Sequence, residues 1–254
     1  FQKLVKDNGD NGLRTISSIL GEKSLNSFKV KKSEFNTSEK LVDDELKNAI
    51  LVAYSNIKKY HEKQLKGLSI TTTETTKGIS LWSDFKPIDT VGLYVPGGTA
   101  PLFSSLLKQA IPAIIAGCKK IIICTPPDKN GKISPTILWT AKLLGIENIF
   151  KVGGSQAIFA MAYGTKSIPK CLKIFGPGNQ FVAEAKRILL FLESHLGYKK
   201  FGFHLQKDYQ TNSDNDNHFS PNKSKLSFFY CPSWSHTFVY HDNHNINATF
   251  IECL

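Results

Sequence analysis

The stretch "KIFGPGNQFVAEAKR", residues 173–187, joins a short apolar run to a helix-like run through four loop residues, Gly176-Pro177-Gly178-Asn179. The apolar run is long enough for a buried strand, and glycine and proline mark the turn that ends it. A strand, a glycine-rich turn and a helix form the repeating unit of folds with a parallel sheet. The stretch therefore predicts one β-α unit.

Three further units of this kind precede it in the chain. The spacing predicts strands at residues 91–95, 120–124, 148–152 and 172–175, with helices at 99–117, 133–144, 155–163 and after Asn179. Such short apolar strands, joined by helices, favour a parallel sheet with helices on both faces and right-handed crossovers. The predicted fold class is therefore α/β, a Rossmann-like parallel sheet with flanking helices.

The residues before the sheet, 1–90, form a polar segment that we expect to be mainly helical. Between residues 43 and 60 the apolar side chains recur every three or four positions, which predicts an amphipathic helix. Residues 69–76 are rich in threonine and are expected to be extended. We expect this segment to be part of the first Rossmann-like domain.

The residues after the sheet, 191–254, break the pattern. They contain six of the seven histidines and the polar run of residues 211–218, and no helix or strand period persists. Disorder or loosely packed strands are expected there. The chain thus divides into a helical segment (1–90), a Rossmann-like domain (91–190) and an irregular tail (191–254).

Composition narrows the classes of partner. The net charge is +11, but the lysines are scattered without interleaved aromatic residues, which disfavours nucleic-acid binding. No run of eighteen apolar residues is present, so no membrane-spanning helix is expected. The five cysteines lack paired spacing, which is typical of a protein of the reducing cytoplasm.

Three glycine-rich loops follow predicted strands and precede predicted helices: residues 96–98, 153–156 and 176–179. Glycine lets backbone approach a ligand closely, and the free N–H groups at a helix start attract anions. Because ligands of open α/β sheets bind beyond the carboxyl ends of the strands, a nucleotide is the expected ligand. A plain sheet with tight turns is the alternative, and neither a full G-x-G-x-x-G nor a P-loop motif is present.

Polar side chains in or beside these loops are the candidate contacts. Tyr94 ends the first strand and is placed to stack on a ring, while Gln156 and Asn179 stand at helix starts and are placed to bond amide or ribose groups. Each of these residue types also serves as a core or capping residue, so the three are candidates only as a set.

Four stretches carry a resemblance to a known family: "VGLYVPGGTAPLFSSLL", "IPAIIAGCKKIIICTPPDKNGKISP", "IFKVGGSQAIFAMAYGTKSIPK" and "KIFGPGNQFVAEAKR". With their spacing they resemble histidinol dehydrogenase. The resemblance continues more weakly upstream through "ETTKGISLWSDFKPID" and covers about residues 25–190.

The resemblance implies an NAD- and zinc-dependent oxidoreductase of histidine biosynthesis. Such an enzyme oxidises L-histidinol through L-histidinal to L-histidine, as a homodimer with two incomplete Rossmann-like domains per subunit. The NAD contacts implied for this sequence are Tyr94, Gln156 and Asn179. Zinc holds the substrate in the family, and a Glu-His pair transfers protons.

The segments that carry the zinc ligands and the Glu-His pair in that family are not found after Leu190. No catalytic residue and no metal ligand is therefore assigned, and no turnover of histidinol by this chain alone is expected. A frameshift, a retained intron or a misassembled gene is the favoured origin of the tail. The cysteines and histidines at residues 231, 236, 241, 244 and 253 do not match a common zinc spacing. Two other functions stay open: a nucleotide-binding remnant without chemistry, and an interaction protein whose tail recruits a partner.

Overall fold

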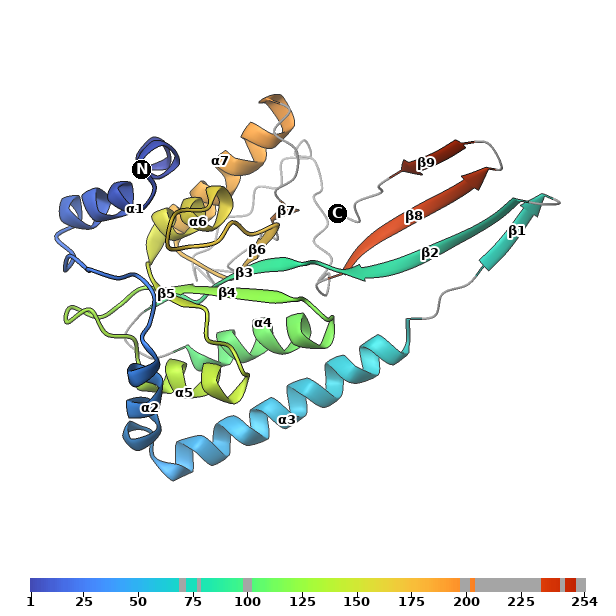
Figure 1. Ribbon diagram of the computed structural model, residues 1–254. Coiled ribbons are helices and arrows are strands. Elements are labelled where there is room, and N and C mark those ends of the chain that lie inside the picture. The colour runs from blue at the N-terminus through green and yellow to red at the C-terminus, as the bar shows by residue number, and fades with distance from the viewer. Residues whose placement is uncertain are drawn as a thin grey trace, which may run out of the picture.

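The computed structural model describes residues 1–68, 72–76, 79–97, 102–196, 202–203, 234–242 and 245–249. Its centre is a parallel sheet of five strands in the order β5-β4-β3-β6-β7 (Figure 1). These strands are β3 (Thr90–Tyr94), β4 (Lys120–Thr125), β5 (Ile149–Lys151), β6 (Lys173–Phe175) and β7 (Gly202–Phe203). The first four confirm the strands expected from the sequence.

Helices cover both faces of this sheet, as predicted. On one face lie α4 (Phe103–Ile115) and α5 (Pro135–Leu143), and on the other lie α6 (Gly154–Tyr163) and α7 (Gln180–Leu196) (Figure 1). Pro112 stands inside α4, which continues through it to Ile115. The first residues of the helix expected at 99–117, up to residue 101, lie outside the described residues.

The strand order contains one reversal. From β3 the chain adds β4 and then β5 on one side, and it returns to place β6 on the other side of β3. The carboxyl ends of β3 and β6 therefore diverge into helices on opposite faces. This is the topological switch point at which open α/β sheets bind ligands.

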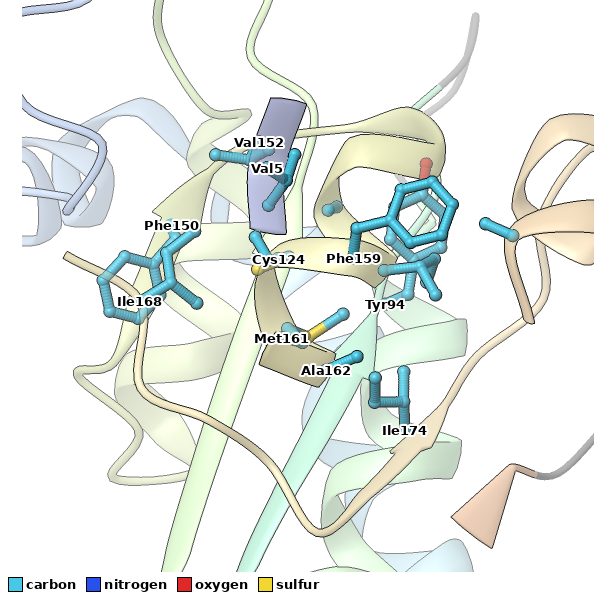
Figure 2. Close-up of a cluster of buried hydrophobic side chains, with 14 of the residues drawn as sticks. Val5, Tyr94, Cys124, Phe150, Val152, Phe159, Met161, Ala162, Ile168 and Ile174 are labelled. Atoms are coloured by element: carbon cyan, nitrogen blue, oxygen red, sulfur yellow. The ribbon is translucent and has the colours of Figure 1, made fainter. Parts of the chain in front are cut away.

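Two apolar cores fill the space between the sheet and its helices. One joins β3, β4 and β6 to α6 and α7, and includes Tyr94, Phe159 and Met161 (Figure 2). The other lies beneath α4 and α5 and includes Leu93, Leu106 and Ile123. Strand β3 contributes to both, since its side chains alternate between faces.

The N-terminal segment packs onto this α/β unit through three helices: α1 (Gln2–Ile19), α2 (Lys32–Leu41) and α3 (Asp44–Lys66). Helix α1 is bent at Gly9, where φ is +52°, and contacts α6. Helix α2 contacts α5, and α3 lies outside α4, against which Ile50 is fully buried. The sequence placed the third of these helices correctly at residues 43–60, and it continues for another turn and a half.

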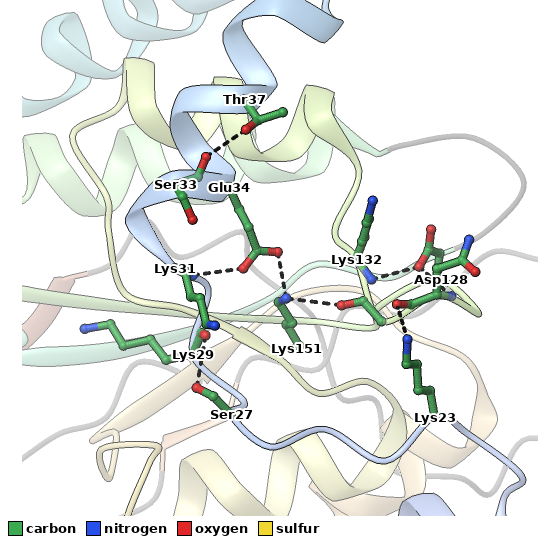
Figure 3. Close-up of polar contacts among 12 residues, drawn as sticks. Lys23, Ser27, Lys29, Lys31, Ser33, Glu34, Thr37, Asp128, Lys132 and Lys151 are labelled. Carbon is green, nitrogen blue, oxygen red and sulfur yellow. Dashed lines mark hydrogen bonds and ion pairs between the residues drawn. The ribbon is translucent and has the colours of Figure 1, made fainter.

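The free edge of β5 is covered by residues 28–30. The amide of Val30 donates to the Ile149 carbonyl at 2.9 Å, and the amide of Lys151 donates to the Phe28 carbonyl at 2.7 Å. The Lys151 ammonium also donates to Glu34 of α2 at 2.6 Å (Figure 3). An exposed strand edge is a template for unwanted pairing, so this cover protects the sheet.

A second sheet is antiparallel, with the order β1-β2-β8-β9. It is built from β1 (Thr72–Thr76), β2 (Ile79–Pro87), β8 (Trp234–Asp242) and β9 (Asn245–Thr249), and Figure 1 shows it projecting from the α/β unit. Strand β1 confirms the extended threonine-rich stretch, while β2 was not predicted. The tail was expected to be disordered or to form loosely packed strands. Its described residues form the end of α7 and the strands β7, β8 and β9, and the other tail residues lie outside the described ranges.

The burial of side chains in the central strands predicts that replacing two isoleucines by alanine will cost different amounts of unfolding free energy. Ile123→Ala in β4 should lower the free energy of unfolding by about 2–5 kcal/mol, because the side chain is fully buried and a cavity is left behind. Ile114→Ala on α4, where the side chain is 42% exposed, should cost less than half as much. Urea titration followed by circular dichroism measures both, and equal losses would contradict the assigned core.

Acid sensitivity is predicted at the contact between α1 and the turn after α6. Both carboxylate oxygens of Asp10 accept hydrogen bonds from Ser167, at 3.2 Å from the amide and 2.6 Å from the hydroxyl. Partial burial raises the Asp10 pKa, but the bonds from Ser167 and Thr165 outweigh it and hold the pKa below its ordinary value. The stability from this carboxylate is therefore present above the ordinary pKa and is lost as pH falls through the lowered one.

Asp10→Asn should therefore lower the free energy of unfolding by about 1 kcal/mol at neutral pH. The difference from the unaltered chain should narrow once the pH is well below about 3.9. The exposed Asp7→Asn on the same helix is the control and should change little at either pH. A loss that is independent of pH would show that the Asp10 charge does not matter.

Candidate functional site: the carboxyl edge of the parallel sheet

The three glycine-rich loops of the sequence meet at the carboxyl edge of the parallel sheet. The first is described as far as Gly97, and the other two are described in full. Gly97 and Gly153 both pack against Pro126, since a Cβ on either would lie within 2.5 Å of an atom of that ring. Pro126 follows β4, so the turns after β3, β4 and β5 are packed together.

The loop after β6 joins this group through backbone contact with β3. A Cβ on Gly176 would lie 2.1 Å from the Tyr94 carbonyl oxygen. The φ of Gly176 is +126°, an angle that residues other than glycine rarely adopt. Gln109 of α4 donates its amide hydrogen to the same Tyr94 carbonyl at 3.3 Å. Glycine is required here because β6 leaves the sheet directly against the end of β3.

Tyr94 reaches the loop after β5 through its hydroxyl. The amide of Gly154 donates to the Tyr94 hydroxyl at 3.0 Å, and the ring lies in the core (Figure 2). Burial raises the pKa of the Tyr94 phenol, although the bond from Gly154 opposes this, so the phenol is neutral at physiological pH. A buried ring favours a role through the hydroxyl, which fixes the start of α6, over stacking on a ligand.

Gln156 stands in the first turn of α6, as predicted, and only 3% of it is exposed. Its side-chain oxygen lies beside Gly154, because a Cβ there would be 2.7 Å from it. Gly154 has a φ of +62°, so glycine suits both the conformation and the space. Tyr94, Gly154 and Gln156 therefore form one contiguous group.

Asn179 is the N-cap of α7. Its side-chain oxygen accepts hydrogen bonds from the amides of Phe181 at 3.1 Å and Val182 at 3.2 Å, the usual action of asparagine at this position. The residue is exposed. The structure therefore places Asn179 on the loop that touches Tyr94, with its amide group at the surface.

A cleft of about 900 Å³ extends along the same edge, over the ends of β3 and β4. Its walls come from α2, from the turns after β3 and β4, and from the start of α5, and they include Glu34, Thr37, Gly97, Thr125 and Asp128. The volume is in the range of small-molecule sites. Sequence reasoning missed this cleft, because the contribution of α2 to its wall depends on tertiary packing.

Two carboxylates at the cleft are already engaged by the protein (Figure 3). Glu34 accepts from the Lys151 ammonium and, at 3.0 Å, from the Lys31 amide. Asp128 accepts from the amides of Asn130 at 2.9 Å and Lys132 at 2.8 Å, which shapes the turn after β4. These contacts fix the positions of the two carboxylates in the cleft wall.

Within the described residues, no group of three or more His, Cys, Asp or Glu side chains lies close enough to hold a metal ion. Of the tail residues considered as ligands, Cys231, His244 and Cys253 lie outside the described residues, and His236 and His241 are described only as backbone. The same part of the chain contains no helix that is long and apolar enough to cross a membrane.

Because Gly176 lies so close to the Tyr94 carbonyl, adding a methyl group at this position should strongly lower the free energy of unfolding. Gly176→Ala should cost more than about 2 kcal/mol of unfolding free energy, because the new Cβ would overlap a backbone oxygen in addition to straining φ. Gly145→Ala is the matched control, with a φ of +70° and open space, and should cost about 1–2 kcal/mol. Similar losses, measured by urea titration, would contradict the contact.

Comparison with known proteins identifies this arrangement. The family model for histidinol dehydrogenase matches residues 2–196, which extends beyond the residues 25–190 recognised from the motifs. The histidinol dehydrogenase of Bacteroides fragilis strain YCH46 is 51% identical over 186 residues, which are 73% of this chain and 43% of that protein. That of Escherichia coli K12 is 46% identical over 183 residues, 72% of this chain and 41% of that protein.

A solved structure agrees with these sequence matches. The crystal structure of histidinol dehydrogenase from Elizabethkingia anophelis superposes with a TM-score of 0.75 at 42% identity, and covers 81% of this chain and 46% of that one. This chain thus spans less than half the length of the curated relatives that it matches. The sequence match over 195 residues, the strand order and the structural similarity agree, and the chain belongs to the histidinol dehydrogenase family.

Proposed function

We propose that this chain binds NAD at the carboxyl edge of its parallel sheet, as the NAD-binding part of a histidinol dehydrogenase. The observation that carries the proposal is the meeting of the glycine-rich turns after β3, β5 and β6 at the switch point between β3 and β6. Helices α6 and α7 begin there, and their first amides favour the pyrophosphate of a dinucleotide. The adjoining cleft of about 900 Å³ offers space for part of such a ligand.

The proposed contacts have distinct tasks. The Asn179 amide is at the surface beside the start of α7, where it can bond a ribose or carboxamide group while its oxygen caps the helix. Gln156 offers an amide in the first turn of α6. Tyr94 acts indirectly. Its hydroxyl accepts a hydrogen bond from the Gly154 amide and so fixes the shape of the loop that carries Gln156.

For the whole protein we propose the reaction of its family, the oxidation of L-histidinol through L-histidinal to L-histidine in the cytoplasm by a homodimer. Bound NAD supplies the acceptor for the hydride that leaves the substrate carbon. The residues described above bind and orient that acceptor. Zinc belongs to this proposal for the whole protein, but we assign it no ligand among the described residues and derive no step through it.

NAD binding by the purified chain tests the proposal. Isothermal titration should show saturable binding below about 1 mM NAD, the upper end of the usual range for enzyme substrates. Gln156→Ala should weaken binding about tenfold, because a buried hydrogen-bonding amide at the proposed site is lost. Gln64→Ala on α3, where the amide bonds His61, is the control and should bind NAD as the unaltered chain does.

The same preparation separates binding from catalysis. We expect no NADH absorbance when L-histidinol and zinc are added to the chain and NAD. NADH formation would show that the chain also carries the chemistry. Absence of NAD binding by a folded chain would refute the proposed function and would favour the interaction-protein alternative.

A further inference from the structure

Lys186 is a buried lysine that the proposed contacts leave unexplained. It lies on α7 about two turns after Asn179, and only 3% of it is exposed. Lysine is among the residues least often buried, because an ammonium group loses its hydration unless it forms hydrogen bonds. Here the Lys186 ammonium donates to the Gly176 carbonyl oxygen at 2.6 Å. The side chain therefore reaches back along α7 to the glycine-rich loop after β6.

The loop has little means of holding its own shape. Gly176 and Gly178 carry no side chain, and Pro177 has no N–H to donate. Gly176 also has a φ of +126°, and neither of its neighbours in the sequence restricts it to that angle. Hydrogen bonding to the Gly176 carbonyl sets the plane of the Gly176–Pro177 peptide, and with it the direction in which Gly178 and Asn179 leave the strand.

Gly176, whose carbonyl Lys186 binds, also packs against the end of β3. The Cβ position of Gly176 is 2.1 Å from the Tyr94 carbonyl oxygen and 3.0 Å from the Gln109 side-chain oxygen, and Gln109 is itself bonded to Tyr94. The loop thus lies between the end of β3 and the Lys186 ammonium. A hydrogen bond from a charged donor is stronger than one between neutral groups, so this contact is well suited to fix the direction of the Gly176 carbonyl.

We propose that Lys186 is a positioning residue, which holds residues 176–179 in the shape that receives the dinucleotide. The inference rests on the proposed NAD function for its ligand. Lys186 acts through the backbone of Gly176 and is not itself placed in contact with the ligand. Pre-organising a binding loop raises affinity because less conformational freedom is lost on binding.

Two neighbouring substitutions separate this role from a general effect of charge. Lys186→Met and Arg187→Met each remove one positive charge from the same turn of α7. The Arg187 side chain is 65% exposed and pairs with Glu184 at 2.7 Å, away from the loop. Lys186→Met should weaken NAD binding about tenfold, a change of about 1.4 kcal/mol, and Arg187→Met should leave it unchanged. Lys186→Arg keeps a charged donor and should recover part of the affinity.

Hydrogen exchange without NAD provides the second measurement. The amides of Phe181 and Val182 donate to the Asn179 side-chain oxygen. The amide of Ala183 donates to the backbone carbonyl of Asn179 at 3.0 Å. In Lys186→Met these amides should exchange faster than in the unaltered chain, while amides of β4 keep their protection. In Arg187→Met both groups should exchange as in the unaltered chain.

The outcomes are distinct. Faster exchange at the start of α7 with weaker NAD binding supports the proposal. Unchanged exchange in Lys186→Met overturns it, and so does faster exchange with unaltered NAD affinity. If the unaltered chain binds no NAD, the proposed function fails, and the exchange rates alone decide whether Lys186 holds the loop.

Discussion

The position of β3 between β4 and β6 is the constraint on which the rest of the structure depends. It pairs in parallel on both sides, and its side chains are buried on both faces. Because parallel neighbours run in the same direction, the turns that leave β3, β4, β5 and β6 emerge at one edge. The glycines at that edge follow from this crowding: Gly97 and Gly153 make room for Pro126, and Gly176 makes room for the end of β3 itself.

The same constraint separates two kinds of glycine that look alike in the sequence. Gly117 and Gly145 have φ near +83° and +70° and end helices, with no close contact that a methyl group would disturb severely. Gly176 lies against the backbone of β3, a strand that is distant in sequence but adjacent to β6 in the sheet. An edge made of the second kind of glycine is shaped by the packing of the sheet itself, which suits the dinucleotide binding proposed above.

Sequence patterns predicted the parts of the fold that local chemistry determines. The four apolar strands, the helices between them and the amphipathic stripe of α3 were predicted because burial imposes a period on the residues themselves. Strand β2 was not predicted, since polar residues such as Ser83 and Asp84 interrupt its apolar ones. The cover of β5 by residues 28–30 and the cleft beside α2 depend on contacts between distant segments, for which one sequence carries no periodic signal. For the candidate site, the sequence predicted the loops. It did not predict the hydrogen bond between the Gly154 amide and the Tyr94 hydroxyl, or the one from Lys186 to the Gly176 carbonyl.

The cover of β5 also bears on how the chain is made. Lys29 and Asn148 are in hydrogen-bond contact although 119 residues separate them. At about 5–20 residues per second, a ribosome needs on the order of ten seconds to deliver the second partner after the first. Helix α1 waits longer, because its apolar face, with Val5, Leu13 and Ile16, packs against α6, which follows β5 in the chain. The apolar face of α1 is therefore exposed during synthesis until residues 154–163 of α6 have been made.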